Sequence, residues 1–219
     1  MKSLAKGVFW IVGFFAICMA GVVFLSNVSE KSAEINYEKE PFLGKEEAPV
    51  SIVEFGDYKC PVCKDFNESF FPLINEQLVE TGKAKFYFMN YSFINVDSNR
   101  SAQFAEAVYQ TLGNDRFWKF HHLMYEKQPD DLSFEKVDLY TNDFLKETLS
   151  EIATDEEVAK VMAVVEKEGS MAAWEKDAET AKELQVSGTP TLFVNGKKFE
   201  GNSFDDLVKM VDEAAADAE

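Results

Sequence analysis

Residues 50–63, Val-Ser-Ile-Val-Glu-Phe-Gly-Asp-Tyr-Lys-Cys-Pro-Val-Cys, decide the fold and carry the chemistry. An apolar run typical of a buried strand ends at Gly56-Asp57, and a Cys-x-x-Cys then opens a predicted helix. Cys60 is therefore expected at the helix N-terminus, where free backbone N–H groups and the helix dipole favour a thiolate. A stabilised thiolate is an abundant nucleophile and a good leaving group. Because Cys63 lies one turn further on, the pair is predicted to form a redox-active disulfide.

The composition excludes several classes of function. The chain has 219 residues, a formal net charge of −17 at pH 7 and 46% hydrophobic residues. This length fits one compact domain with an insertion and a short terminal segment. A chain this acidic offers no basic patch for phosphates, so nucleic-acid binding is excluded. Three cysteines are too few for a disulfide-stapled scaffold.

The N-terminal segment, residues 1–28, is predicted to be a membrane anchor or a signal segment. Lys2 and Lys6 precede an uncharged apolar run from Gly7 to Leu25. As a helix this run would be about 28 Å long, close to the ~30 Å thickness of a hydrocarbon core. A retained single-pass anchor with its N-terminus inside is favoured, and a cleaved signal is the alternative. Both predict a domain outside the cytoplasm, at the cell membrane or secreted.

The rest of the chain predicts an α/β domain with a helical insertion. Residues 29–47 are expected to be a polar tether. Residues 48–95 indicate strand, helix and parallel strand, 96–184 indicate helices throughout, and 185–219 indicate two strands and a helix. Asn195-Gly196 predicts the turn between those last two strands. We therefore expect a mixed sheet with helices on both faces, capped by the insertion.

The element boundaries follow from the apolar spacing and the turn residues. Strands are predicted at 50–55, 84–89, 189–194 and 198–200. Helices are predicted at 61–80 with a kink at Pro72, at 98–112, 115–127, 134–149, 155–168 and 170–185, and after Ser203.

Zinc is the first alternative for the Cys-x-x-Cys. A structural zinc site needs about four ligands, and the only histidines are the neighbours His121 and His122. Neighbouring helix positions point about 100° apart, so both cannot readily bind one ion. We therefore predict no metal at Cys60 and Cys63, and we assign both histidines to packing or surface. Two interpretations of Cys60 and Cys63 remain, a redox-active disulfide and a purely structural one.

Glu54 is a second candidate site residue. It lies in the apolar run Ser51–Phe55, where a carboxylate is costly to bury without a partner or a task. The expected task is proton exchange with Cys63, through a pKa raised by desolvation. The alternative is that strand alternation points Glu54 to solvent or into an ion pair.

Thr189 and Pro190 form a third candidate feature, in the run Ser187-Gly188-Thr189-Pro190. A proline at the start of a strand that faces the cysteines is a candidate cis peptide. This bend would leave the Thr189 backbone free to pair with an extended substrate chain. The alternative is an ordinary trans turn.

Three ordered motifs, at 53–63, 117–128 and 186–196, resemble the DsbA-like thiol–disulfide oxidoreductases, most closely their membrane-anchored Gram-positive type. The resemblance covers residues 42–217 and implies a thioredoxin fold interrupted by a helical domain. It implies that Cys60 is the exposed attacking cysteine and Cys63 the buried resolving one.

The same resemblance assigns the remaining site residues and the partners. It implies that Glu54 is the family's buried acid, Pro190 its cis-proline and Thr189 the residue before it. No cofactor is needed, because the Cys60–Cys63 disulfide itself holds two electrons. The implied partners are unfolded exported proteins with paired cysteines and a membrane quinone-linked, DsbB-like reoxidising partner.

One departure concerns redox tuning. The best-known oxidising members have Pro-His between the cysteines, whereas this chain has Pro61-Val62. Valine cannot donate a hydrogen bond to the Cys60 thiolate, although Lys59 and Lys64 are expected to help electrostatically. We therefore predict an oxidant milder than the strongest members.

The sequence thus predicts an extracytoplasmic protein thiol–disulfide oxidoreductase that introduces disulfides into exported proteins. A protein-disulfide reductase, for example in cytochrome maturation, is the enzymatic alternative. A third possibility is an anchored peptide-binding module in which the Cys60–Cys63 disulfide is only structural.

Overall fold

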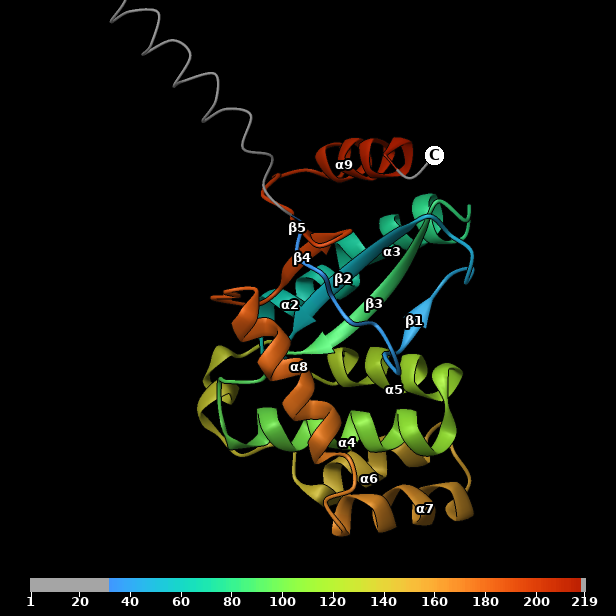
Figure 1. Cartoon of the computed structure of the whole chain (residues 1–219). Helices are drawn as coiled ribbons and strands as arrows, with labels where there is room; N and C mark the ends of the chain where they lie inside the picture. Colours follow the sequence, from blue (N-terminus) through green and yellow to red (C-terminus); the bar gives the residue numbers. More distant parts are fainter. Residues whose placement is uncertain (1–31, 218–219) are drawn as a thin grey trace, which may run out of the picture. The chain divides into compact units, whose positions relative to one another are not determined.

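The strand that precedes the two cysteines lies at the centre of a five-stranded mixed sheet (Figure 1). The structure is a computed structural model and describes residues 32–217. β2 and β3 are parallel, and every other neighbouring pair in this sheet is antiparallel. Across the sheet the strands run β1 (Phe42–Leu43), β3 (Ala84–Asn90), β2 (Val50–Gly56), β4 (Thr191–Val194) and β5 (Lys197–Lys198).

The predicted strands are confirmed to within a few residues, and β1 is an addition to them. The turn between β4 and β5 is Asn195-Gly196, with φ of 44° and 77°. These left-handed values are those that the Asn-Gly pair favours in a tight hairpin. At Gly196 the requirement is also steric, because an added Cβ would lie 1.8 Å from the Ala33 carbonyl oxygen.

Alternation along the strands separates two apolar layers. Ile52, Phe86 and Leu192 belong to the first layer, which α3 (Phe71–Ile74) and α9 (Phe204–Ala216) help to cover. The second layer contains Val53 and Phe193 together with residues of α8 (Met171–Glu183) and of the segment that leads into β1. Glu54 lies two residues after Ile52 in β2, so the two side chains point to the same face of the sheet. It therefore points into the first layer, the one that also contains Cys63.

The chain from 61 to 79 is helical, as predicted, but its hydrogen bonding changes along its length. It passes through two π-helical stretches. At the end of the first, Phe71 N–H donates to Phe66 O, five residues back. Pro72 has no N–H to continue an α-helical ladder, and it lies in the first turn of α3. The predicted kink is thus a widened turn. The four segments are α2 (Pro61–Asp65), η1 (Phe66–Phe70), α3 (Phe71–Ile74) and η2 (Asn75–Val79).

The insertion is helical, and its long helices α4 to α7 lie together beyond the arrowheads of β2 and β3 (Figure 1). Phe104, Phe117 and Phe120 are fully buried in it, as their helical spacing predicts. The segments are α4 (Val96–Leu112), α5 (Asn114–Glu126), the 3₁₀ turn η3 (Leu132–Lys136), α6 (Asn142–Ser150), α7 (Asp155–Glu166) and α8 (Met171–Glu183).

The helix predicted over 134–149 is wrong for residues 137–141. Val137 and Thr141 have extended backbones, and the Thr141 side chain caps α6 by accepting a bond from Phe144 N–H. The backbone N–H groups of Leu139 and Tyr140 donate to Asp97 Oδ2 instead of continuing a helix. A contact distant in sequence therefore overrides the local periodicity.

The polar tether expected over 29–47 is shorter than predicted, because residues from Ala33 onward pack on the sheet. Ala33 N–H donates to Gly196 O, and the rings of Tyr37 and Tyr87 stack with centroids 4.3 Å apart. The Asn114 side chain accepts from Phe42 N–H and donates to Phe42 O, as a neighbouring strand would. The segment packs because it carries aromatic residues such as Tyr37 among its acidic ones, and these contact the sheet.

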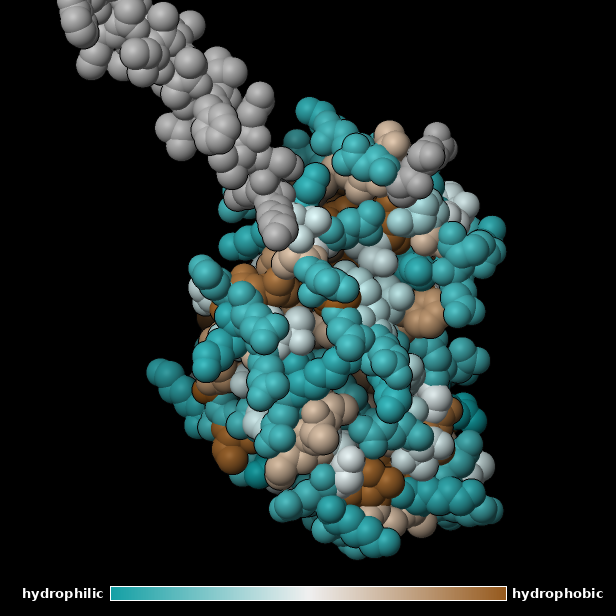
Figure 2. Space-filling view, in the orientation of Figure 1, coloured by the Kyte–Doolittle hydropathy of each residue, from teal (hydrophilic) through white to brown (hydrophobic). Residues whose placement is uncertain are grey.

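Among residues 32–217, no helix is long and apolar enough to cross a membrane. The segment predicted to be an anchor or signal, residues 1–28, lies outside the described residues. The face of the domain in Figure 2 is covered largely by hydrophilic residues, and apolar residues appear there in small patches. That surface agrees with the strongly negative net charge.

Candidate active site

The first turn of α2 is built around Cys60, which is the residue that caps it. Cys60 has an extended backbone, with φ −83° and ψ 118°, and its carbonyl accepts from the N–H groups of Cys63 and Lys64. Pro61 has no N–H to offer, and the N–H groups of Val62 and Cys63 lie close enough to the Cys60 sulfur to lower its pKa. A negative charge on Sγ is stabilised there.

The turn between β2 and α2 is held by Asp57. Its Oδ1 accepts from Lys59 N–H at 2.8 Å, and its Oδ2 accepts from Phe93 and Ile94 N–H at 3.0 and 3.3 Å. Gly56 is required just before it, because a Cβ there would lie 2.4 Å from the Phe88 ring. The sequence predicts Gly56-Asp57 only as the end of the strand, although Asp after Gly at a strand end is also a turn signal.

Cys60 and Cys63 are free thiols in this structure. A hydrogen bond from the Cys63 thiol lowers the pKa of Cys60 from 9.0 to about 6. Burial opposes this shift, and the Thr189 contact and the N–H groups of Cys63 and Val62 add to it. At neutral pH the Cys60 side chain is therefore mainly a thiolate.

Cys63 behaves in the opposite way. Burial, followed by its hydrogen bond to Cys60 and the charge of Glu54, raises the pKa of Cys63 well above its ordinary value. The side chain is fully buried, and Cys60 is the more accessible of the two, with 6% exposed. Cys60 is thus less exposed than the family resemblance implies, since Thr189 lies across it. One cysteine is an anion and the other a thiol.

Glu54 lies fully inside the first apolar layer, with 1% of its surface exposed. Burial, followed by the charge of Cys60, raises the pKa of Glu54 well above its usual range. Within the described residues its Oε1 has no hydrogen-bond partner. The alternatives of a solvent-facing or ion-paired Glu54 are therefore wrong, and burial favours the protonated form of the carboxyl group.

The Thr189–Pro190 peptide bond is cis, as the sequence predicts. Antiparallel pairing of Thr191 with Phe55 places this bend beside the end of β2. Cys60 Sγ lies 3.3 Å from Thr189 O, to which it can donate only while the thiol is protonated. The main chain of residue 189 therefore faces the sulfur at which a substrate would react.

The two lysines beside the cysteines are not free to act on Cys60, contrary to expectation. Lys59 Nζ is buried and lies 2.5 Å from Asp97 Oδ2. Lys64 Nζ lies 2.7 Å from Asp130 Oδ1. Because each ammonium already has a carboxylate partner, neither provides the electrostatic help that the sequence suggests.

Gln128 is a contact residue of the site that sequence reasoning missed. Its Nε2 donates to Tyr58 O at 2.9 Å and to Cys60 O at 3.1 Å, and both groups are buried. The residue closes the 117–128 motif, which contributed to the family resemblance without any role for its final side chain. The position of Gln128 at the end of that motif is the sequence feature that could have identified it as a site residue.

The histidines take the packing role that the sequence assigns to them. His121 is buried, and its two nitrogens lie 3.2 Å from Tyr58 Oη and from Asn67 Nδ2. Burial, followed by the charge of His122, lowers the pKa of His121 well below its usual range. His121 is therefore a neutral member of the core.

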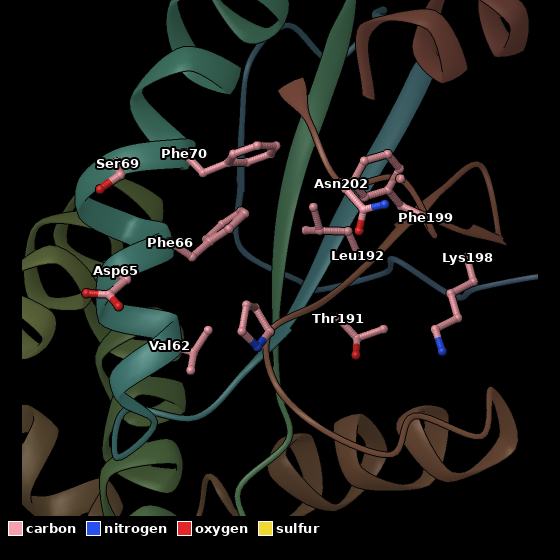
Figure 3. A pocket seen from close by; sticks show the side chains of 12 residues that line it. Val62, Asp65, Phe66, Ser69, Phe70, Thr191, Leu192, Lys198, Phe199 and Asn202 are labelled. Atoms are coloured by element: carbon pink, nitrogen blue, oxygen red, sulfur yellow. The ribbon is translucent and has the colours of Figure 1, made fainter. Parts of the chain in front are cut away.

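An open cavity of about 630 Å³ begins beside Pro190 (Figure 3). The rings of Phe66 and Phe70 point across it toward Leu192 and Phe199 from the opposite side. Asp65 and Lys198 also line it. The arrangement offers an apolar groove, next to Cys60, for a side chain of a bound peptide.

Comparisons with known proteins agree with this site. A family model described as Thioredoxin matches residues 36–213. The probable disulfide bond formation protein D of Bacillus anthracis is 31% identical over 215 residues, which cover 96% of this chain and 95% of that protein. The disulfide bond formation protein D of Bacillus subtilis is 34% identical over 178 residues, covering 81% and 78% of the two chains.

Solved structures give the same picture. Oxidised BdbD from Bacillus subtilis superposes with a TM-score of 0.76 at 32% identity, covering 84% of this chain and 97% of that one. DsbA from Chlamydia trachomatis gives a TM-score of 0.68 at 21% identity, covering 83% and 93%. The second likeness supports the fold alone.

The lowered pKa of Cys60 predicts how stability depends on pH. Its folded-state pKa of about 6 lies below the ordinary 9.0, so its stabilising contribution is complete above pH 9 and is lost as pH falls through 6. The free energy of unfolding of the reduced protein, minus that of reduced Cys60→Ala, should therefore rise between pH 6 and 9. Urea unfolding at several pH values measures it, and a flat or falling difference would contradict the assignment.

Proposed function

Because the chain belongs to the thioredoxin family, as a DsbA-like protein of the BdbD type, we propose that it introduces disulfide bonds into exported proteins. It is a thiol–disulfide oxidoreductase and works with a redox-active cysteine pair. The observation that carries the proposal is the asymmetry at α2, where the pKa of Cys60 is lowered and that of Cys63 is raised. Stabilising the reduced thiolate makes the disulfide the less stable, oxidising form.

In the first step a substrate thiolate attacks Sγ of Cys60 in the oxidised pair. The Cys60–Cys63 bond breaks, a mixed disulfide forms between the substrate and Cys60, and Cys63 leaves with the electron pair. Because the pKa of Cys63 is raised, its sulfur takes up a proton. Glu54 is buried in the same apolar layer, where desolvation raises the pKa of its carboxyl group, so we assign it as the donor of that proton.

In the second step another substrate thiolate attacks the substrate sulfur of the mixed disulfide. A disulfide forms in the substrate, and Cys60 leaves as the thiolate that the first turn of α2 stabilises. Two electrons have then passed from the substrate to the cysteine pair. We assign the main chain at Thr189 and the bend at Pro190 to holding the substrate backbone beside Cys60.

Pro61 and Val62 set the strength of the oxidant. The Val62 side chain is apolar and largely exposed, so it adds no hydrogen bond to the thiolate, although its backbone N–H does. We therefore expect a potential less oxidising than that of members with Pro-His at these positions. The lowered pKa of Cys60 still favours an oxidase over a reductase.

The cellular setting is proposed from the sequence. Residues 1–28 would hold the domain at the outer face of the cell membrane, or would be removed to release it. A membrane quinone-linked, DsbB-like partner would reoxidise Cys60 and Cys63, so that no bound cofactor is required. Within the domain, we propose that 48–95 and 185–219 form the catalytic part and 96–184 its cap.

Trapping of substrates tests the function. In Cys63→Ala the resolving sulfur is missing, so exported proteins with paired cysteines should accumulate as mixed disulfides on Cys60, detected by non-reducing electrophoresis and mass spectrometry. Cys60→Ala should trap nothing. Capture of cytochrome-maturation proteins alone would favour the reductase alternative, and unchanged activity of Cys60→Ser would favour the peptide-binding module.

Replacing Glu54 tests its proton-transfer role. Glu54→Gln keeps the shape but removes the proton donor, so oxidation of a model dithiol peptide at pH 7 should slow by roughly a hundredfold, the lower range for such catalysis. Glu106→Gln is the matched control, since Glu106 is an equally buried carboxyl group on α4. Equal rates in both variants, measured by quenched flow, would remove Glu54 from the mechanism.

The groove makes a separate prediction about substrates. Phe199→Ala removes an apolar wall, so KM for peptides with a large apolar residue near the cysteine should rise about tenfold, from the loss of one buried aromatic contact. Leu73→Ala truncates an exposed apolar residue of α3 that does not line the groove. Steady-state kinetics should leave that control unchanged, and a matching KM increase there would argue against the groove.

A further inference from the structure

Lys59 precedes the reactive cysteine, yet its side chain is buried in the insertion. Its Nζ lies 2.5 Å from Asp97 Oδ2, and both side chains have no exposed surface. The same ammonium donates to Val137 O. It also lies 5.6 and 5.5 Å from the ring centroids of Phe134 and Tyr140. Every partner of this ammonium belongs to the insertion, whereas the lysine backbone belongs to the catalytic turn.

Stability alone does not explain this pair. Removing two charges from water costs several kcal/mol per ion, and apolar replacements of buried pairs are often neutral or stabilising. What an ion pair supplies is a fixed direction. Asp97 is itself held, because it lies in the first turn of α4 and accepts from Leu139 and Tyr140 N–H.

The backbone of Lys59 is fixed at the other end of the same side chain. Its N–H donates to Asp57 Oδ1 at 2.8 Å, and the next N–H, of Cys60, donates to Asp57 O at 2.9 Å. Main chain and side chain are thus held by two different parts of the domain. The peptide between residues 59 and 60 has little freedom to rotate, and that peptide determines where Cys60 Sγ points.

We propose that Lys59 is a positioning residue for Cys60: its ion pair with Asp97 holds Cys60 in the extended capping conformation that directs Sγ at the first turn of α2. The inference rests on the proposed function, in which that sulfur is the reactive one. Lys59 acts through geometry, because its charge is already paired. Without the anchor, residue 60 samples other orientations, and the N–H groups of Val62 and Cys63 stabilise the thiolate less.

The test uses the full-length protein and three variants of it. Lys59→Met removes the ammonium, and Lys59→Met/Asp97→Asn also removes the carboxylate that would be left buried without it. Arg100→Met is the matched control. Arg100 ties α4 to the same 137–140 segment, through Asp138 at 2.5 Å and Tyr140 O at 3.0 Å, without touching residue 59.

Two readouts separate positioning from stability. The pH midpoint for alkylation of Cys60 should rise by about half a unit to one unit in both Lys59 variants, as thiolate-stabilising hydrogen bonds weaken. The equilibrium constant for oxidation of glutathione should fall roughly threefold to tenfold. Arg100→Met should match the wild type in both. If Lys59→Met does not fold, the neutral double variant still gives both values.

Wild-type values in all variants, whatever their unfolding free energies, would overturn the inference, as would equal shifts in Arg100→Met. These outcomes are distinct from failure of the proposed function. In that case the wild-type protein would itself exchange no electrons with glutathione or peptide dithiols.

Discussion

The site depends on one constraint: Cys60 caps α2, and its sulfur meets the Cys63 thiol and the N–H groups of Val62 and Cys63. A thiolate satisfies those groups, and the helix dipole favours its charge. Each pKa unit of thiolate stabilisation corresponds to about 30 mV in a two-electron couple. At pH 7 the shift from 9.0 to about 6 is therefore worth about one unit, roughly 30 mV toward the oxidising side, because its full effect is reached only above pH 9.

Burial supplies the second half of the chemistry. Cys63 and Glu54 lie in the same apolar layer, where desolvation keeps both in their protonated forms. The two sulfurs are only three positions apart, yet one is an anion and the other a thiol. The site is covered from two sides: Gln128 of the insertion donates to the carbonyl of Cys60, and Thr189, at the bend before β4, lies 3.3 Å from its sulfur.

Much of this could be predicted from sequence, because the signals are local. Strand and helix periods define the βαβ unit, and Gly-Asp before the Cys-x-x-Cys locates the helix N-terminus. Failures occur where distant residues meet. The pairing of Lys59 with Asp97, the extended backbone at 137–141 and the packing of Tyr37 on Tyr87 depend on tertiary contacts that no sequence window contains. Charge alone suggested that Lys59 would serve Cys60, whereas the fold directs it elsewhere.

The most direct measurement of the central claim is the ultraviolet absorbance of the thiolate in the reduced protein, titrated from pH 4 to pH 10. The account predicts a single transition with a midpoint near 6, absent in Cys60→Ala, and no second thiolate before the ordinary cysteine range has been passed. A midpoint near 9 for Cys60 would show that the helix N-terminus does not hold an anion. The explanation of an oxidising disulfide would then be wrong.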